Sequence, residues 1–311
     1  MMEKEKIFLS AVVYVCNDES RVGAFLSRLC QTLNANFEQY EIICVNDASS
    51  DGSIGAIRSS AEAAHGIISI VNLSYQQGLE AAMNAGVDLS IGDFVFEFDS
   101  IRLDYPPALV MDVYGRSLEG YDIVAASGSR RKLGSSLFYW LFNRSAQMQY
   151  QLQTETFRIL SRRAINRIHS MSQTIPFRKA LYANCGLKAD TIRYKPVFAE
   201  RRRLSRSGHR YRFSTALDSM VLFTNLAFNI SFVLALVMMA ATLAGGIYVL
   251  MIFLLGQPVE GYTTTMLLIT ASFFGVFALL AVILKYLSII VRLIFSKQKY
   301  VIESVEKIPN A

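Results

Sequence analysis

Apolar runs and amphipathic segments alternate along the first third of the chain. Apolar runs of strand length are predicted at residues 7–15, 40–45, 67–73 and 93–98. Segments with helical periodicity separate them, at residues 21–33, 53–64 and 78–90. This β-α-β-α-β-α-β order predicts an α/β fold, in which helices cover both faces of a mostly parallel sheet.

A different pattern occupies the last third, where Glu260 is the only charged residue between Met220 and Leu284. Two apolar runs, at residues 221–255 and 262–284, have no polar face at helical spacing. Each is longer than the ~20 residues that a helix needs to cross a bilayer. We predict two transmembrane helices; the alternative is a pair of fully buried helices in a large soluble domain.

Basic residues flank the two runs but are absent from the turn between them, at residues 256–261. The positive-inside rule then predicts that both termini are cytoplasmic. The expected organisation is a cytoplasmic domain at residues 1–215 that ends in a basic segment, a transmembrane hairpin at 216–290, and a basic cytoplasmic tail at 291–311.

Composition agrees with a membrane protein, because 52% of the residues are hydrophobic. The net charge of +6 is concentrated beside the predicted spans, which favours membrane lipids with anionic headgroups over nucleic acid as partners. The oligomeric state is left open, and a homo-oligomer is compatible with the sequence.

Polar residues cluster where the predicted parallel strands end. Asn17, Asp18 and Glu19 follow the first strand, Asp47 follows the second, and Asp99 follows the fourth. Ligands of such sheets bind beyond the carboxyl ends of the strands. The simpler interpretations are that Asp18 and Glu19 complement a helix dipole and that Asp47 belongs to a turn.

Several segments carry a family resemblance, and they occur in the family's order. Residues 12–19, V-V-Y-V-C-N-D-E, resemble the V-V-P-V-Y-N-E-E opening of inverting family-2 glycosyltransferases. Residues 41–53, E-I-I-C-V-N-D-A-S-S-D-G-S, resemble E-I-I-F-V-D-D-G-S-S-D-G-S. Residues 73–86 are similar to the L-S-R-N-F-G-K-x-A-A-x-x-A-G helix, and residues 105–107 to D-P-P.

The later segments narrow the resemblance to a subfamily. Residues 157–163, F-R-I-L-S-R-R, are similar to F-R-L-x-x-R-x, and residues 206–211 to R-x-x-G-x-S-x-Y. With two C-terminal spans, nearly the whole chain resembles the polyprenyl-phosphate glycosyltransferases, relatives of dolichol-phosphate mannose synthase. The resemblance implies a GT-A fold followed by a transmembrane hairpin.

The implied activity is inverting transfer of a sugar from a nucleotide sugar, UDP-linked, to undecaprenyl phosphate. It would take place at the cytoplasmic face of the bacterial inner membrane, for modification of cell-surface polysaccharide or lipopolysaccharide. The alternative is a catalytically weak or inactive homologue that acts as a membrane scaffold or partner subunit.

The resemblance also implies roles for individual residues. The expected nucleotide-binding residues are Asn17, Asp18, Glu19, Asp47 and Gly78, and the expected catalytic residues are Asp99, Asp104 and Arg158. Asp99 would hold Mg²⁺ or Mn²⁺ against the pyrophosphate. Arginines would bind the lipid phosphate, namely Arg130, Arg131, Arg201, Arg202 and Arg203.

The chain departs from the family at its acidic motif. The usual D-x-D reads Asp99-Ser100-Ile101 here, with Arg102 next. Asp104 is a candidate for a displaced second acid, and Arg102 is a candidate for replacing the charge of the metal. The family's Asp before F-R-L is Thr156 in this chain. An ionised phosphate acceptor needs little help from a general base, so this last change is compatible with activity.

Overall fold

The computed structural model describes residues 4–61, 65–128, 154–171, 178–197 and 300–308, together with scattered helical positions between 233 and 290. The chain divides into two units, one formed by Met1–Thr215 with Lys297–Ala311 and the other by Ala216–Ser296. Most of the predicted spans, at 221–255 and 262–284, lie outside the described residues. Among the residues that are described, no helix is both long and apolar enough to cross a membrane.

The first unit is built on a mixed, mostly parallel sheet of eight strands, ordered β7-β5-β6-β4-β1-β2-β3-β8. Strands β1 to β4 are mutually parallel, as are β5 and β7, whereas β6 and β8 run antiparallel to their neighbours. The strands are β1 (Leu9–Val15), β2 (Tyr40–Asn46), β3 (Ile67–Leu73), β4 (Phe94–Phe98), β5 (Ile123–Gly128), β6 (Phe157–Ser161), β7 (Ala189–Tyr194) and β8 (Ile302–Ile308).

The predicted α/β order of the first third is confirmed. Helices α1 (Glu19–Asn36), α2 (Ser53–Ala61) and α3 (Leu79–Leu89) connect the first four strands. Three further helices lie in the later described segments, namely α4 (Ala108–Leu118), α6 (Arg162–Met171) and α7 (Arg178–Asn184). Because β1 to β4 are parallel, their carboxyl ends, and the polar residues that follow them, lie along one edge of the sheet.

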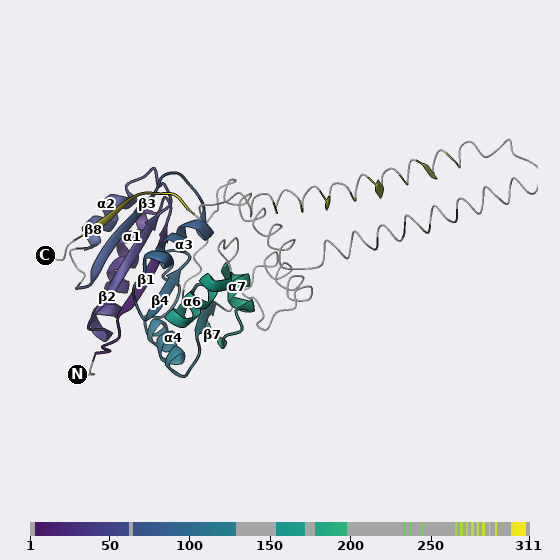
Figure 1. Cartoon of the computed structure of the whole chain (residues 1–311). Coiled ribbons are helices and arrows are strands. Elements are labelled where there is room, and N and C mark those ends of the chain that lie inside the picture. Colours follow the sequence, from purple (N-terminus) through teal and green to yellow (C-terminus); the bar gives the residue numbers. More distant parts are fainter. Residues whose placement is uncertain are drawn as a thin grey trace, which may run out of the picture. The chain divides into compact units, whose positions relative to one another are not determined.

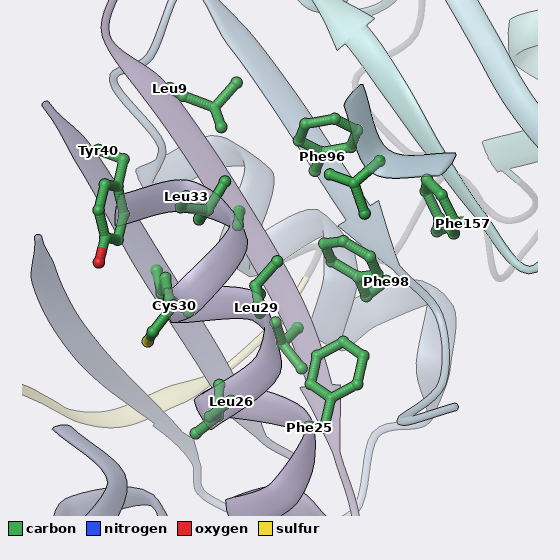
Figure 2. Packing of buried hydrophobic residues seen from close by; sticks show 14 of the residues in the cluster. Leu9, Phe25, Leu26, Leu29, Cys30, Leu33, Tyr40, Phe96, Phe98 and Phe157 are labelled. Carbon is green, nitrogen blue, oxygen red and sulfur yellow. The ribbon is translucent and has the colours of Figure 1, made fainter. Parts of the chain in front are cut away.

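Helices cover both faces of this sheet. On β1, Val13 belongs to the hydrophobic cluster that includes Phe25 and Leu29 of α1. Its neighbour Val12 points to the opposite face, as alternation along a strand requires, and there it meets α3 at Gly86. Figure 2 shows Phe25, Phe96, Phe98 and Phe157 gathered on the α1 side, where the rings of Phe25 and Phe98 lie 5.3 Å apart.

Strand β8 is an element that the sequence analysis did not predict, since it lies in the segment interpreted as a tail. It pairs antiparallel with β3, with Ile302 opposite Leu73 and Ile308 opposite Ile68, and forms an edge of the sheet (Figure 1, yellow). Arg58 of α2 holds Glu306 through two contacts of 2.8 and 2.9 Å. The chain therefore returns, after residue 296, to the unit in which it began.

The contact between α3 and the sheet predicts a steric effect at Gly86. A Cβ atom there would lie 2.3 Å from Val12 Cγ1 and 2.7 Å from Val45 Cγ2, both on buried strands. Gly86→Ala should therefore destabilise the protein by about 1–3 kcal/mol, lowering its thermal unfolding midpoint in detergent. Gly115→Ala in α4 is the matched control, because nothing lies within 4 Å of its added Cβ; an equal loss in both variants would contradict the packing argument.

Candidate functional site

The loops that follow β1 and β2 interlock at the carboxyl edge of the sheet. The backbone N–H of Asn17 donates to Ser49 Oγ at 3.0 Å, and Asn17 Oδ1 accepts from the N–H of Ser50 at 2.8 Å. Glu19 Oε2 accepts from the N–H of Gly52 at 3.1 Å. Four of these five residues are exposed, so the interlocked loops present polar groups to solvent at the edge where a ligand is expected.

Two residues of these loops adopt left-handed backbone conformations, Asn17 with φ of 51° and Ala48 with φ of 49°. Asparagine tolerates this region, whereas alanine pays a steric cost there. The surrounding hydrogen bonds hold both residues in place. Strain of this kind is frequent at ligand-binding turns.

Asp18 is buried beneath these loops. Its carboxylate forms an ion pair with Arg21, and its backbone N–H donates to Ser53 Oγ at 2.9 Å. The residue precedes α1, in the N-cap position. Asp18 thus takes part in the local structure that the simpler interpretation anticipated, and its predicted contact with a nucleotide stays a prediction.

Asp47 is fully buried and organises the loop before α3. Its Oδ1 accepts from the backbone N–H of Gln77 at 2.7 Å, and its Oδ2 accepts from the N–H of Gly78 at 3.0 Å. Tyr14 donates its hydroxyl to the same Oδ2 at 2.8 Å. Burial and the charge of Asp47 raise the pKa of Tyr14, so the phenol keeps its proton. Two predicted nucleotide-binding residues, Asp47 and Gly78, are thereby in direct contact.

Asp99, at the carboxyl end of β4, is held by two arginines. Its Oδ2 accepts from Arg158 Nη2 at 2.7 Å, and its Oδ1 accepts from Arg178 Nη2 at 2.8 Å. Burial by itself would raise the pKa of Asp99, but the charges of Arg158 and Arg178 outweigh it and hold that pKa well below its ordinary value. The carboxylate is therefore ionised at neutral pH, and each of its oxygens accepts a hydrogen bond from an arginine.

Glu97 lies on β4, two residues before Asp99, and forms ion pairs with the same two arginines. Arg158 Nη1 lies 2.7 Å from Glu97 Oε2 and Arg178 Nη1 lies 2.6 Å from Glu97 Oε1, while Tyr182 donates its hydroxyl to Oε1 at 2.8 Å. Glu97 and Arg158 are directly opposite each other on the antiparallel strands β4 and β6. Each guanidinium thus bridges two carboxylates of one strand, which sets its position closely.

Further carboxylates complete the cluster. Arg158 Nε contacts Glu155 at 2.8 Å, and Arg178 Nε contacts Glu80 at 3.1 Å. Burial would lower the pKa of both arginines, but the surrounding carboxylates raise it well above its ordinary value. With Lys179, whose Nζ lies 3.7 Å from Glu155, the cluster brings three basic side chains against four carboxylates.

Sequence analysis identified Asp99 and Arg158 but not Glu97, Arg178 or Tyr182. A signal was present in the strand itself, because Glu97 interrupts an otherwise apolar run, Phe94-Val95-Phe96-Glu97-Phe98. A carboxylate in the middle of a buried strand requires partners of opposite charge. Arg178 could not be assigned as that partner from spacing, since 81 residues separate it from Glu97.

Asp104 does not join this cluster. Its Oδ1 accepts from Tyr194 at 3.2 Å, and its Oδ2 lies 3.9 Å from Arg102 Nη1. Ile101, which stands where the family has its second acid, is buried in the hydrophobic cluster. Thr156, where the family has another Asp, shares a hydrogen bond of 2.6 Å with Tyr194.

These contacts do not fit the predicted Mg²⁺ or Mn²⁺ site. Both oxygens of Asp99 already accept from arginines, and the candidate second acid, Asp104, faces Arg102 and Tyr194 instead. Within the described part of the chain, no group of three or more His, Cys, Asp or Glu side chains is arranged to hold a metal ion. The predicted lipid-phosphate arginines, Arg130, Arg131, Arg201, Arg202 and Arg203, lie outside the described residues.

Comparisons of the sequence with known proteins find glycosyltransferases among its relatives. The chain is 29% identical over 273 residues to an uncharacterised glycosyltransferase of Synechocystis, covering 85% of this chain and 84% of the relative. It is 24% identical over 306 residues to the bactoprenol glucosyl transferase of Shigella phage SfII, covering 95% and 97%.

A solved structure is similar in fold, the mannosyltransferase of Pyrobaculum calidifontis in complex with GDP-Man and Mn²⁺. Its TM-score is 0.52 at 14% identity, over 94% of this chain and 89% of that one. This likeness shows a GT-A-like fold. The model of the family described as glycosyl transferase family 2 matches residues 10–170, more than half of the chain. The protein therefore belongs to glycosyl transferase family 2, and it is a glycosyltransferase.

Proposed function

We propose that this glycosyltransferase transfers a sugar from a UDP-sugar to undecaprenyl phosphate at the cytoplasmic face of a bacterial membrane, with inversion at the anomeric carbon. The observation that carries the proposal is the similarity to a bactoprenol glucosyl transferase over 95% of this chain, which includes the apolar C-terminal third. The polar loops after β1 and β2 lie where a nucleotide-sugar donor would bind, because nucleotide ligands of such sheets bind beyond the carboxyl ends of the strands.

The fold supports attachment to the membrane through residues 216–296. Because β8 belongs to the same sheet as β1, the chain before residue 216 and after residue 296 lies on one side of any bilayer that the intervening segment enters. An even number of crossings follows, as the two predicted spans require. Apolar side chains at described helical positions of this segment, including Val233, Val237, Val276 and Ile283, are exposed, which suits contact with lipid.

The reaction is a direct displacement at the anomeric carbon. An oxygen of the lipid phosphate attacks on the face opposite the nucleotide, and the new C–O bond forms as the bond to the nucleoside diphosphate breaks. The electron pair of the broken bond leaves on the β-phosphate oxygen. The attacking phosphate is already ionised, so the reaction proceeds without the carboxylate that Thr156 replaces. Positioning and neutralisation of two anionic substrates supply most of the rate.

Arg102 provides positive charge for the leaving group in this proposal. Arg158 and Arg178 are buried, and their guanidinium groups are engaged with carboxylates, so they position Asp99 and the end of β4. Arg102 follows that strand end, its side chain is 32% exposed, and its contact with Asp104 is long, at 3.9 Å. It is thus better placed than the two buried arginines to exchange a protein partner for a phosphate.

The loss of the second acid favours one alternative, a homologue without transferase activity that serves as a partner subunit. Ile101 stands where the family's D-x-D motif has its second carboxylate, and both oxygens of Asp99 accept hydrogen bonds from arginines. The alternative predicts membrane insertion without transfer to lipid.

An assay of lipid-linked product tests the proposed function. Membranes that contain the protein should convert undecaprenyl phosphate into a lipid-linked sugar with at least one donor from a panel of UDP-glucose, UDP-galactose and UDP-N-acetylglucosamine. Thin-layer chromatography detects the product, and NMR of its anomeric proton should show the configuration opposite to that of the donor. Failure with every donor would contradict the proposal and favour the partner subunit.

The second prediction concerns the source of positive charge at the leaving group. Transfer should persist in EDTA and fall by about 100-fold in Arg102→Gln, because removal of one group that stabilises transition-state charge costs on the order of 100- to 1000-fold. Asp104→Asn is the matched control, since it removes the partner of Arg102 and leaves the arginine in place. Loss of transfer in EDTA that added Mn²⁺ restores would assign the charge to a metal ion instead.

The third prediction concerns topology. A cysteine at Gln257, between the predicted spans, should react with a membrane-impermeant maleimide in intact spheroplasts. A cysteine at the exposed Gln31 of α1 should react only after permeabilisation. The four native cysteines are buried, so background labelling should be low. Labelling of Gln31→Cys from outside would overturn the cytoplasmic assignment.

A further inference from the structure

The C-terminal segment enters the sheet at the edge where the donor is expected. Strand β3 ends at Leu73, and Ile302 at the start of β8 lies opposite that residue. Tyr300 and Val301, which precede β8, therefore lie beside the carboxyl ends of the parallel strands. Tyr300 donates its hydroxyl to Asp88 at 2.9 Å, close to the end of α3.

Gln77 joins this segment through its side-chain amide. Its Nε2 donates to the carbonyl oxygen of Val301 at 2.7 Å, and its Oε1 accepts from the backbone N–H of Val301 at 2.8 Å. Ser74 also donates its N–H to the Val301 carbonyl, at 3.2 Å. A reciprocal pair of amide hydrogen bonds fixes distance and orientation together, as it does between two strands. The loop at residues 74–78 is thereby held by the chain that returns after residue 296.

The same residue contacts Asp47 through its backbone. The N–H of Gln77 donates to Asp47 Oδ1 at 2.7 Å, and the N–H of Gly78 donates to Oδ2 at 3.0 Å. Gly78 has a φ of 89°, a conformation that side chains rarely allow. The hydrogen bonds to Val301 and to Asp47 therefore meet in one residue, Gln77, within a loop that has no regular strand or helix pairing of its own.

Strand β8 has other attachments that do not involve this loop. Ser304 accepts from Asn72 Nδ2 at 3.1 Å, and Glu306 pairs with Arg58 at 2.8 Å. The backbone ladder with β3 spans Ile302 to Ile308. The strand should therefore stay in place when the contact between Gln77 and Val301 is removed, which separates the role of Gln77 from that of β8.

We propose that Gln77 is a positioning residue for the donor site, through which the C-terminal segment at Val301 orders the 74–78 loop and the carboxylate of Asp47. The inference rests on the proposed function in placing the nucleotide sugar at this edge. A loop that is ordered before binding spares the donor the entropy of ordering it. The contact thus lowers the KM for the donor and leaves the rate of the displacement itself unchanged.

Kinetics on the full-length protein in membranes test this role. Gln77→Ala should raise the KM for the active nucleotide sugar roughly three- to tenfold, as expected for the net loss of hydrogen bonds, with kcat within about twofold of the wild type. Val301→Pro, which lacks the backbone N–H, should have a similar effect, whereas Val301→Ala, which keeps both backbone groups, should not. The double variant Gln77→Ala/Val301→Pro should show no additive increase, because the two changes remove one interaction.

Hydrogen exchange gives a readout that does not depend on activity. The backbone amides at positions 77 and 78 should exchange roughly tenfold faster in Gln77→Ala than in the wild type. Arg58→Ala is the control, because it removes an exposed contact with β8 that does not reach the loop. Its KM and its exchange at residues 74–78 should match those of the wild type.

The outcomes separate the inference from the proposed function. Unchanged exchange at Gln77 and Gly78 in Gln77→Ala overturns the inference, whether or not the wild type is active. A fall in kcat at constant KM also overturns it, because the loop would then act on the chemical step. Absence of transfer by the wild type contradicts the proposed function and the role in donor binding together, while faster exchange in Gln77→Ala would still establish the link between Val301 and Asp47.

Discussion

The arrangement of the site depends on one constraint, a carboxylate in the middle of a buried strand. Glu97 is fully buried in β4, between Phe96 and Phe98. Arg158 from β6 and Arg178 from α7 neutralise it, and each of them also holds Asp99. Removing one partner of such a buried pair costs roughly 3–5 kcal/mol, because a charge is left without compensation. The cluster therefore ties β6, α7 and, through the contact of Arg178 with Glu80, α3 to the end of β4. It also fixes the direction of Asp99.

This cluster changes what the acidic motif can do. In a D-x-D motif two carboxylates face the donor phosphates, but here one oxygen of Asp99 binds each arginine and Ile101 packs in the core. The carboxylate of Asp99 is thereby paired with two cations and held in a fixed direction. In the proposed function, positive charge for the leaving group comes from Arg102, which follows this strand end and has a side chain that is 32% exposed.

The structure also depends on how the outer strand β3 is paired. Parallel strands leave an unpaired edge at β3, and β8 covers it with a strand from the other end of the chain. That pairing satisfies the backbone groups of β3 and moves the edge of the sheet to β8, which carries charged residues as edge strands commonly do. It also brings the chain that follows residue 296 to the loop before α3, where Gln77 and Asp47 meet. One strand thus pairs with the edge of β3 and leads, through Val301, to the loop that contacts Asp47.

The sequence by itself determined the α/β order of the first third, because strand and helix periodicities are local properties, and it placed Asn17, Asp47 and Asp99 at one edge, because parallel strands share their direction. It also indicated the family, through motifs that occur in a fixed order. It did not reveal that Arg178 pairs with Glu97 or that β8 pairs with β3, since these partners are 81 residues apart in the first case and, at Ile70 and Glu306, more than 200 apart in the second. Only the tertiary structure decided that Asp99 holds two arginines, because a carboxylate has the same local sequence signal whether it faces a ligand or a buried cation.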